Sequence, residues 1–202
     1  IFYRSSKTLE EFVAVDVNDM DCISAELVGD VKNQNLHSLS GYELVILSHP
    51  DFISEAKRLA EIHEMHDGIN AIVVTPEQIY NEYSSGTPDA TAIRLFMRQM
   101  YERNGKSDTY LLLMGDGSFD NRAILRSAST TINNFILTYQ GGSSNDESAT
   151  FTSDDYYGML SPTAFQSGKV CNGNIDIGVG RLPVTTLEEA KVMVDKIETY
   201  LK

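Results

Sequence analysis

The sequence lacks the residues that mark several specialised classes of protein. It has no tryptophan, five prolines and only two cysteines, Cys22 and Cys171, among 202 residues. Two cysteines can form one bridge at most, which excludes a disulfide-dense scaffold and leaves open whether this pair is bridged. Apolar runs are also short, about five residues as at 110–114, whereas a membrane-spanning helix needs roughly 18. We therefore expect no membrane span.

Positive charge is scarce as well. The chain carries 16 lysine and arginine residues against 29 aspartate and glutamate residues, which gives a formal net charge of −13. Binding to nucleic acid requires a basic surface that neutralises phosphates, and docking on anionic lipid requires a similar one. The composition therefore argues against both partners. Its length suffices for one large domain with its own core, or for two small ones.

No leader segment is recognisable at the start of the chain. The sequence opens with Ile1-Phe2-Tyr3-Arg4, without an initiating methionine and without a basic stretch followed by an apolar one. The missing methionine indicates a piece excised from a longer protein. In that case the absent signal carries no information about location.

Apolar runs alternate with helical patterns from residue 41 onward. Runs of four or five residues predict buried strands at 44–47, 71–74, 110–114 and 175–179. Apolar residues at helical spacing, with capping and proline signals, predict helices at about 50–66, 76–83, 90–101 and 187–201. This alternation predicts an α/β fold over 41–202, with a small parallel sheet flanked by helices.

Two other regions give a weaker signal. Short apolar stretches predict strands at 12–15 and 25–28, so residues 1–40 are expected to form an N-terminal extension that is partly β. Between 115 and about 150 the sequence is mostly loop, with a brief strand expected at 135–139. So long a loop inside an α/β pattern is unusual and often functional.

Functional residues of a parallel sheet gather beyond the carboxyl ends of its strands. Here these ends are expected at Ser48-His49, Thr75, Gly115-Asp116 and Gly180-Arg181. The sequence therefore predicts that any site lies where these four points meet.

The aspartates near these ends admit two interpretations. Asp116, Asp120 and Asp154 could hold a metal ion for a hydrolase, although their spacing is not that of an EF-hand loop. Asp116 could equally bond its own backbone in a tight turn. The adjacent Asp154 and Asp155 would point to opposite faces of an extended segment. We favour the structural interpretation for all four.

Histidines and cysteines do not form a catalytic pair by spacing alone. His63 and His66 stand in His-Glu-Met-His, one residue short of the zinc-binding His-Glu-x-x-His, so an exposed helix face is the better interpretation. His49 follows a strand, where a capping role is favoured over that of a general base. A nucleophilic cysteine needs a paired base and a lowered pKa, and neither signal accompanies Cys22 or Cys171.

Several longer stretches, taken together, resemble a known family. They occur in the expected order over most of 33–202: NQNLH (33–37), VILSHPDF (45–52), VVTPEQIYNEYSSGTPDATAIR (73–94), YLLLMGDGSFDNR (110–122), TSDDYYG (152–158) and IDIGVGRLPV (175–184). Through them the chain resembles the gingipain-like cysteine peptidases, peptidase family C25. Within that family it is most similar to the branch that includes the cell-surface sortase of the type IX secretion system.

The resemblance implies a caspase-like catalytic domain of two subdomains, of which 41–202 would be the first. The second would carry the catalytic His, in a Gly-His-Gly setting, and the nucleophilic Cys. This sequence contains no Gly-His-Gly, so we assign no catalytic residue to it. The resemblance further implies peptide-bond cleavage or transpeptidation by the parent protein, protein or peptide substrates bound through the second subdomain, and export to the bacterial outer membrane surface.

The resemblance also implies structural calcium, although no cofactor for the reaction itself. The matching oxygens here would be those of Asn172, Asp176 and the Met114 main-chain carbonyl. An alternative function is a non-enzymatic protein-binding α/β module that uses the 115–150 loop.

Overall fold

The computed structural model describes residues 16, 26–27, 29–122, 134–141, 151–161 and 174–202. The chain divides into two compact units, Ile1–Asn33 and Gln34–Lys202, and every helix and strand of the described part belongs to the second. The strand expected at 12–15 lies outside the described residues. So do both ends of the one expected at 25–28, whose two middle residues are in neither helix nor strand.

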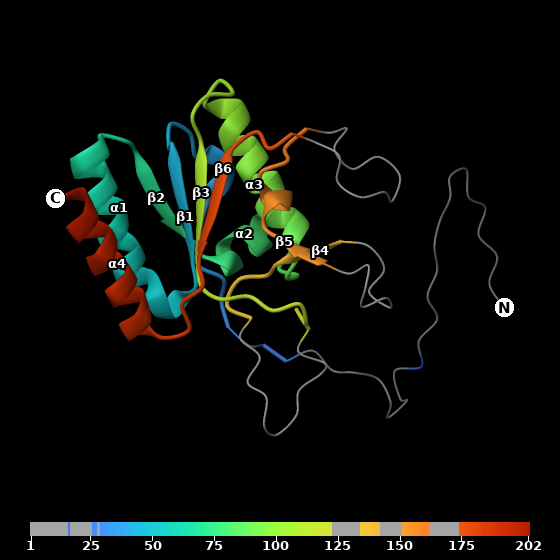
Figure 1. The fold of residues 1–202 in the computed structure, drawn as a ribbon. Coiled ribbons are helices and arrows are strands. Elements are labelled where there is room, and N and C mark those ends of the chain that lie inside the picture. Colours follow the sequence, from blue (N-terminus) through green and yellow to red (C-terminus); the bar gives the residue numbers. More distant parts are fainter. Residues whose placement is uncertain (1–15, 17–25, 28, 123–133, 142–150, 162–173) are drawn as a thin grey trace. The chain divides into compact units, whose positions relative to one another are not determined.

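A four-stranded parallel sheet forms the centre of the second unit (Figure 1). Its strands are β1 (Leu44–Ser48), β2 (Ala71–Val74), β3 (Tyr110–Met114) and β6 (Gly178–Leu182), in the spatial order β2-β1-β3-β6. A separate antiparallel pair joins β4 (Tyr139–Gly141) to β5 (Phe151–Ser153). The predicted α/β class with a small parallel sheet is confirmed.

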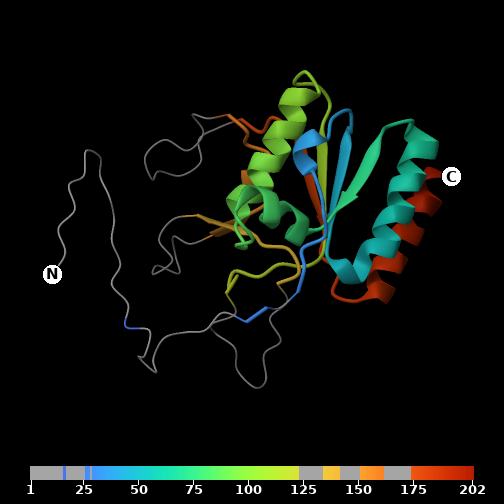
Figure 2. The ribbon, with the colours of Figure 1, turned by 180° about the vertical axis from the view of Figure 1, so that it is seen from behind.

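Helices cover both faces of this sheet, as Figures 1 and 2 show from opposite sides. The helices α1 (Ile53–Asp67) and α4 (Leu187–Leu201) lie on one face, and α2 (Pro76–Tyr83) and α3 (Ala90–Arg103) lie on the other. Three short 3₁₀ helices complete the described elements: η1 (Leu36–Ser38), η2 (Pro50–Phe52) and η3 (Asp155–Tyr157).

The second unit begins seven residues before the expected boundary at 40/41, because its first residues are bonded to α2. The Glu82 carboxylate accepts hydrogen bonds from the main-chain N–H of Leu36 (2.7 Å) and of His37 (3.1 Å). It also accepts one from the Gln34 amide at 2.9 Å. Residues 34–38 are therefore part of the α/β unit.

Most helix ends follow the capping signals of the sequence. The Thr75 hydroxyl accepts from the Gln78 N–H and the Gln78 side chain accepts from the Thr75 N–H, which completes the predicted capping box of α2. Gly68 ends α1 with a left-handed φ of 69°, which glycine adopts without strain. Thr186 and Glu189 also have the spacing of a capping box at α4, but this box is incomplete, because the Glu189 carboxylate accepts from the Thr185 N–H and hydroxyl instead.

Two predicted strands are displaced. The strand expected at 175–179 begins only at Gly178, because the residues before it are bonded outside the sheet: the Asp176 N–H donates to the Gly158 carbonyl. The strand expected at 135–139 contributes only Tyr139 to β4. Its first two residues instead donate their N–H groups to the Asp116 carbonyl, which the sequence pattern could not show.

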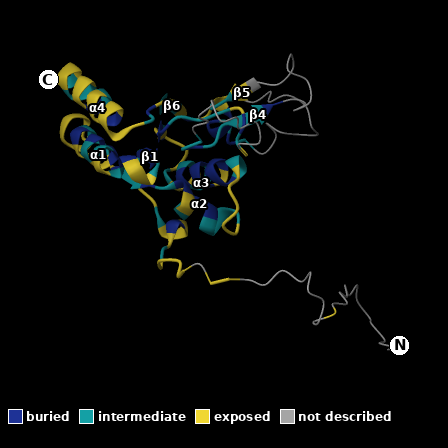
Figure 3. Ribbon diagram, turned by 90° about the horizontal axis from the view of Figure 1, so that it is seen from below, coloured by how far each residue is buried: buried dark blue, intermediate teal, exposed yellow. Residues whose placement is uncertain are grey.

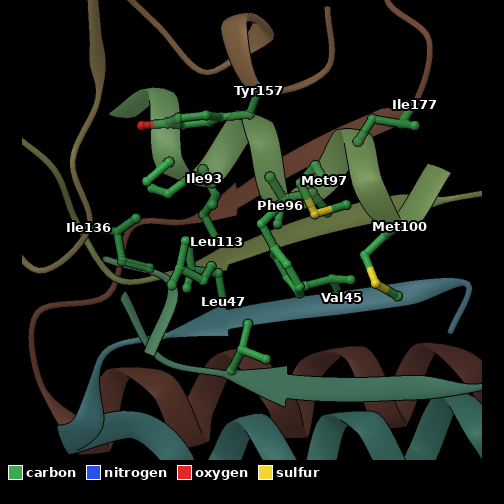
Figure 4. Close-up of a cluster of buried hydrophobic side chains, with 14 of the residues drawn as sticks. Val45, Leu47, Ile93, Phe96, Met97, Met100, Leu113, Ile136, Tyr157 and Ile177 are labelled. Carbon is green, nitrogen blue, oxygen red and sulfur yellow. The ribbon is translucent and has the colours of Figure 1, made fainter. Parts of the chain in front are cut away.

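The core has two parts, one on each face of the sheet. On the α2/α3 face, β1 and β3 side chains pack against α3 and Tyr157 (Figure 4). On the other face, Leu44 and Ile46 of β1 pack against the inner sides of α1 and α4. Because both faces of β1 are buried, its sequence is the continuous apolar run that predicted it.

Candidate functional site

The carboxyl edge of the sheet brings the predicted strand ends together. The His49 N–H, just after β1, donates to the Met114 carbonyl at the end of β3 (3.2 Å). The N–H groups of Gly115 and Asp116 donate to the carbonyls of Leu182 and Val184, both at 3.0 Å. The segments leaving β1, β3 and β6 are thus joined by their main chains, and Gly180-Arg181 lies inside β6 rather than after it.

Residues 135 and 136 lie beside the crevice between β1 and β3, where strand order reverses. In parallel sheets this is the usual place for a ligand. Here the Asp116 carbonyl accepts from the N–H groups of Phe135 and Ile136, at 3.1 and 3.2 Å. Gly117 permits the approach, since a Cβ at this position would lie 2.7 Å from the Ile136 carbonyl oxygen. Residues 135 and 136 are therefore bonded directly to the segment that leaves β3.

Arg181 holds this edge together, and sequence reasoning missed its role. Its guanidinium makes a bidentate ion pair with Asp154, with both N–O distances at 2.7 Å. It also donates to the carbonyls of Gly115, Ile136 and Leu137, at 2.8, 3.2 and 3.3 Å. Five contacts from one half-buried side chain connect β6 to three segments. The sequence signal for this role was a single arginine among the small and apolar residues of β6.

Two aspartates of the metal-hydrolase interpretation, Asp116 and Asp154, make structural contacts. The Asp116 carboxylate accepts from the Gly117 N–H at 2.9 Å, and so bonds the backbone beside it. Asp154 is neutralised by Arg181, and Asp155 lies in the first turn of η3. No group of three metal-binding side chains occurs within the described residues. The structural interpretation favoured from the sequence fits these contacts.

Each of the four histidines makes a local contact. The His49 ring accepts from the Asp51 N–H at 3.3 Å and so caps η2, while burial lowers its pKa despite the nearby Asp51. His63 and His66 both contact the carboxylate of Asp67, at 2.6 and 2.7 Å. His37 contacts the Gln99 side chain at 2.9 Å.

Neither cysteine can be paired with a histidine from this structure. Cys22 and Cys171 both lie outside the described residues. The part of the chain that the structure describes therefore contains no thiol, and the predicted absence of a catalytic pair remains a prediction for those two residues.

Asp176 and Met114, two of the three residues expected to bind calcium, are not brought together. Asp176 precedes β6 at the amino edge of the sheet, whereas Met114 ends β3 at the carboxyl edge, because β3 and β6 are parallel with Tyr110 opposite Gly178. At about 3.3 Å per residue the two edges lie roughly 13 Å apart. One Asp176 oxygen already accepts from the Leu160 and Ser161 N–H groups, and Asn172 lies outside the described residues. The described residues do not fit a calcium ion that touches both Asp176 and Met114.

An open apolar surface borders β6. Within the described residues β6 pairs only with β3, so its other edge has no neighbouring strand. Beside that edge α4 and Leu182 line a groove of about 650 Å³, with Met193, Ile197 and Tyr200 among its walls. Tyr200 is 89% exposed. Figure 3 shows the exposed residues along α4.

The described helices include none that is long and apolar enough to cross a membrane. This finding agrees with the short apolar runs of the sequence.

The sheet order and the two helix layers define the class of the protein as a doubly wound parallel α/β domain. The sequence model of peptidase family C25 matches residues 37–202 of the chain. The chain therefore belongs to peptidase family C25, a family of cysteine peptidases.

Two solved structures from Porphyromonas gingivalis resemble the chain. Dimeric latent PorU is 37% identical, with a TM-score of 0.74 over 85% of this chain and 16% of its own. The complex of RgpB pro- and mature domains is 20% identical, with a TM-score of 0.48 over 78% of this chain and 28% of its own. No curated protein matches. The chain thus spans about a sixth of the PorU chain.

Proposed function

We propose that this chain is the scaffolding part of a C25 cysteine endopeptidase or sortase and is inactive alone. The observation that carries the proposal is the family match over 37–202, in a chain whose four histidines all make local structural contacts. The catalytic histidine and cysteine would then belong to another part of the parent protein.

The proposed reaction of the parent is attack of a thiolate on a peptide bond, with an imidazole as the base. The acyl group would pass to water in a peptidase or to an amine in a sortase. Thiol and imidazole supply the nucleophile and the base, so the proposed reaction needs no metal or cofactor. Substrates would be proteins or peptides bound by the catalytic part.

The scaffold would meet the catalytic part at the surface beside β6. PorU is about six times longer than the segment it shares with this chain, so proteins of this kind have further chain to place. A neighbouring element would pair the free main-chain groups of the β6 edge and bury the apolar groove along α4. This supports the catalytic part as their occupant.

The identity of 37% to PorU, over 85% of this chain, favours the sortase-like branch within the proposal. An exported protein at the bacterial outer membrane surface is proposed on the same ground. The acidic net charge of −13 is compatible with that location.

Peptide cleavage tests the scaffolding role directly. This chain and the longest natural protein that contains it are incubated with a fluorogenic peptide mixture and a thiol reductant. We expect thiol-dependent cleavage by the longer protein alone. Variants Cys22→Ala and Cys171→Ala of the longer protein should keep their activity. Thiol-dependent cleavage by this chain alone would contradict the proposal, as would loss of activity in either variant.

A further inference from the structure

The first segment of the second unit is bound mainly by side chains of α2 and α3. The Glu82 carboxylate accepts from the N–H groups of Leu36 and His37, at 2.7 and 3.1 Å. The Gln99 amide donates to the carbonyl of Leu36 at 3.2 Å. The N–H and the carbonyl of one residue are thus both held by side chains, as at a protein surface that recognises the main chain of a peptide.

The side chains of this segment are held as well. Leu36 is 6% exposed and belongs to the core cluster of the α2/α3 face. Gln34 donates its amide to the Gln78 carbonyl at 2.7 Å, and the His37 ring lies against the Tyr83 ring with centroids 4.4 Å apart. A buried apolar anchor surrounded by polar contacts is the usual arrangement of a protein interface. The pattern that fits this surface is therefore Gln-x-Leu-His, residues 34–37.

This segment can leave the surface without breaking a strand or an α-helix. Residues 34–37 contain only the start of η1 and pair with no strand of the described sheets. On either side, 29–33 and 39–43 are in neither helix nor strand, and 29–33 are exposed. Arg103 also donates to the Leu39 carbonyl at 2.9 Å, at the exposed surface. Release of the segment would therefore uncover one leucine pocket and leave the sheet intact, which requires less free energy than global unfolding.

The same contacts can be made between two molecules. Each copy of the chain carries both the segment and the surface that binds it, so an exchange of segments preserves the hydrogen bonds of residues 34–37. Residues 38–43 tether the segment to β1, and six residues span up to about 20 Å when extended. The tether favours the segment of the same chain, because a short linker acts as an effective concentration of about 1 mM. Weakening that segment should therefore open the surface to another molecule.

We propose that the surface around Glu82 and Gln99 is a peptide-binding site for the pattern Gln-x-Leu-His. Residues 34–37 of the same chain occupy it in this structure, and the same residues of a second copy fill it when they are released. The proposal does not depend on the function proposed above. It concerns α2 and α3, whereas the surface proposed to meet the catalytic part borders β6.

Peptide binding to the full chain tests the site. The probe is a fluorescently labelled peptide of residues 33–40, read by anisotropy. The Leu36→Ala chain, whose own segment has lost its anchor, should bind this peptide about 10-fold more tightly than the unaltered chain does. The same peptide carrying Leu36→Ala should bind that chain about 10-fold more weakly. Gln34→Ala gives a second chain with a weakened segment and an unaltered core, and should show a smaller gain in affinity.

Two matched charge variants locate the bound peptide. Added to the Leu36→Ala chain, Glu82→Gln should weaken peptide binding about 10-fold, because it removes the charge that holds two main-chain N–H groups. Glu77→Gln, on the exposed side of the same helix, should leave the affinity unchanged. The proposal would be overturned by an equal effect of Glu77→Gln. It would also be overturned if neither weakened chain binds peptide up to about 1 mM, the effective concentration of the tethered segment.

Mixing two variants tests the second copy. The Leu36→Ala chain keeps the site and loses the anchor, whereas the Glu82→Gln chain keeps the anchor and loses the charge of the site. We expect a complex with the mass of two chains when they are mixed, seen by analytical ultracentrifugation, and none from either variant alone at the same total concentration. Adding Leu36→Ala to the Glu82→Gln chain should abolish this complex. A mixture that does not associate, although the peptide binds, would overturn the assignment to a second copy.

Discussion

The two faces of the sheet differ in how completely they are covered. On the α2/α3 face, apolar side chains from three strands, from both helices and from Ile136 and Tyr157 form one cluster, and the largest of them are fully buried. On the α1/α4 face the buried cluster is smaller, and α4 leaves an apolar groove open beside β6. One face is thus complete within this chain, whereas the other offers apolar surface to a further element.

The cause of this difference lies in α4 and β6. The apolar stripe of α4 includes buried Ala190 and Val194, but it extends to half-buried Met193 and Ile197. On the strand, Gly180 brings no side chain to fill the space, and a Cβ there would meet only Leu112, at 3.7 Å. The apolar stripe of α4 is thus wider than the surface that covers it in this unit. Such a stripe is typical of a helix that packs against a second neighbour.

The largest expected effect is on the complete face. Phe96→Ala removes a fully buried ring from α3 and should lower the free energy of unfolding by about 3–5 kcal/mol. The neighbouring Leu95→Ala, at a position that is 39% exposed, serves as the control and should cost less than about 1 kcal/mol. Urea unfolding measures both. Equal losses would mean that the α3 face is not the stabilising one.

Removal of Arg181 tests the polar contribution to the same face. Arg181→Met leaves the Asp154 carboxylate and the Gly115 and Ile136 carbonyls without this donor, and should cost about 2–4 kcal/mol. Adding Asp154→Asn should recover part of the loss, because the uncompensated charge is then gone. A double-mutant cycle by urea unfolding gives the coupling. A coupling near zero would show that the two side chains do not stabilise each other.

Glu82 makes the attachment of residues 34–38 depend on pH. Partial burial opposes ionisation, but the N–H donors of Leu36, Gln34 and His37 together lower the pKa of this carboxyl. A lowered folded-state pKa gives stability that is present at neutral pH and is lost as the pH falls below the ordinary glutamate value.

Glu82→Gln should therefore cost about 1–2 kcal/mol at pH 7 and less at pH 3, which is closer to the lowered pKa of the native carboxyl. Urea unfolding at both pH values measures the difference. Glu77→Gln on the same helix is the control, since its carboxylate holds no main-chain N–H within the described residues. A loss that is the same at both pH values would contradict the role of the charge.

The smallest effect on stability is expected on the open face. Tyr200→Ser should change the free energy of unfolding by less than about 0.5 kcal/mol, because the side chain is 89% exposed. It should nevertheless reduce the binding of an apolar dye, read by fluorescence, because it removes part of the groove. A large loss of stability would show instead that the groove is part of the core of this unit.

The sequence predicted three strands closely because they are buried on both faces and read as continuous apolar runs. It misplaced β6, whose residues Gly178–Leu182 include two glycines and an arginine, while the apolar Ile175 and Ile177 precede the strand. Capping signals were informative because a cap such as Thr75 bonds within three residues of its own position, although the cap of α3 was open between Thr87 and Asp89, and the structure has Asp89.

Contacts distant in sequence were beyond such reasoning. Arg181 and Gly115 lie 66 residues apart, and no local pattern connects them. The separation of Asp176 from Met114, in contrast, follows from topology. In a parallel sheet the strands all begin at one edge and all end at the opposite edge. That argument was available from the predicted topology alone.

The packing of α1 against α4 has a consequence for how the unit assembles. Arg58 of α1 is bonded to Glu198 of α4, 140 residues later. During synthesis β1, β2, β3 and the first three helices can come together once residue 114 has emerged, whereas β6 and α4 follow only after some 60 further residues. In that interval α1 shields its side of the sheet alone, and β3 is an edge strand. The open face is thus also the last to close, and the order of synthesis leaves its apolar residues exposed for longest.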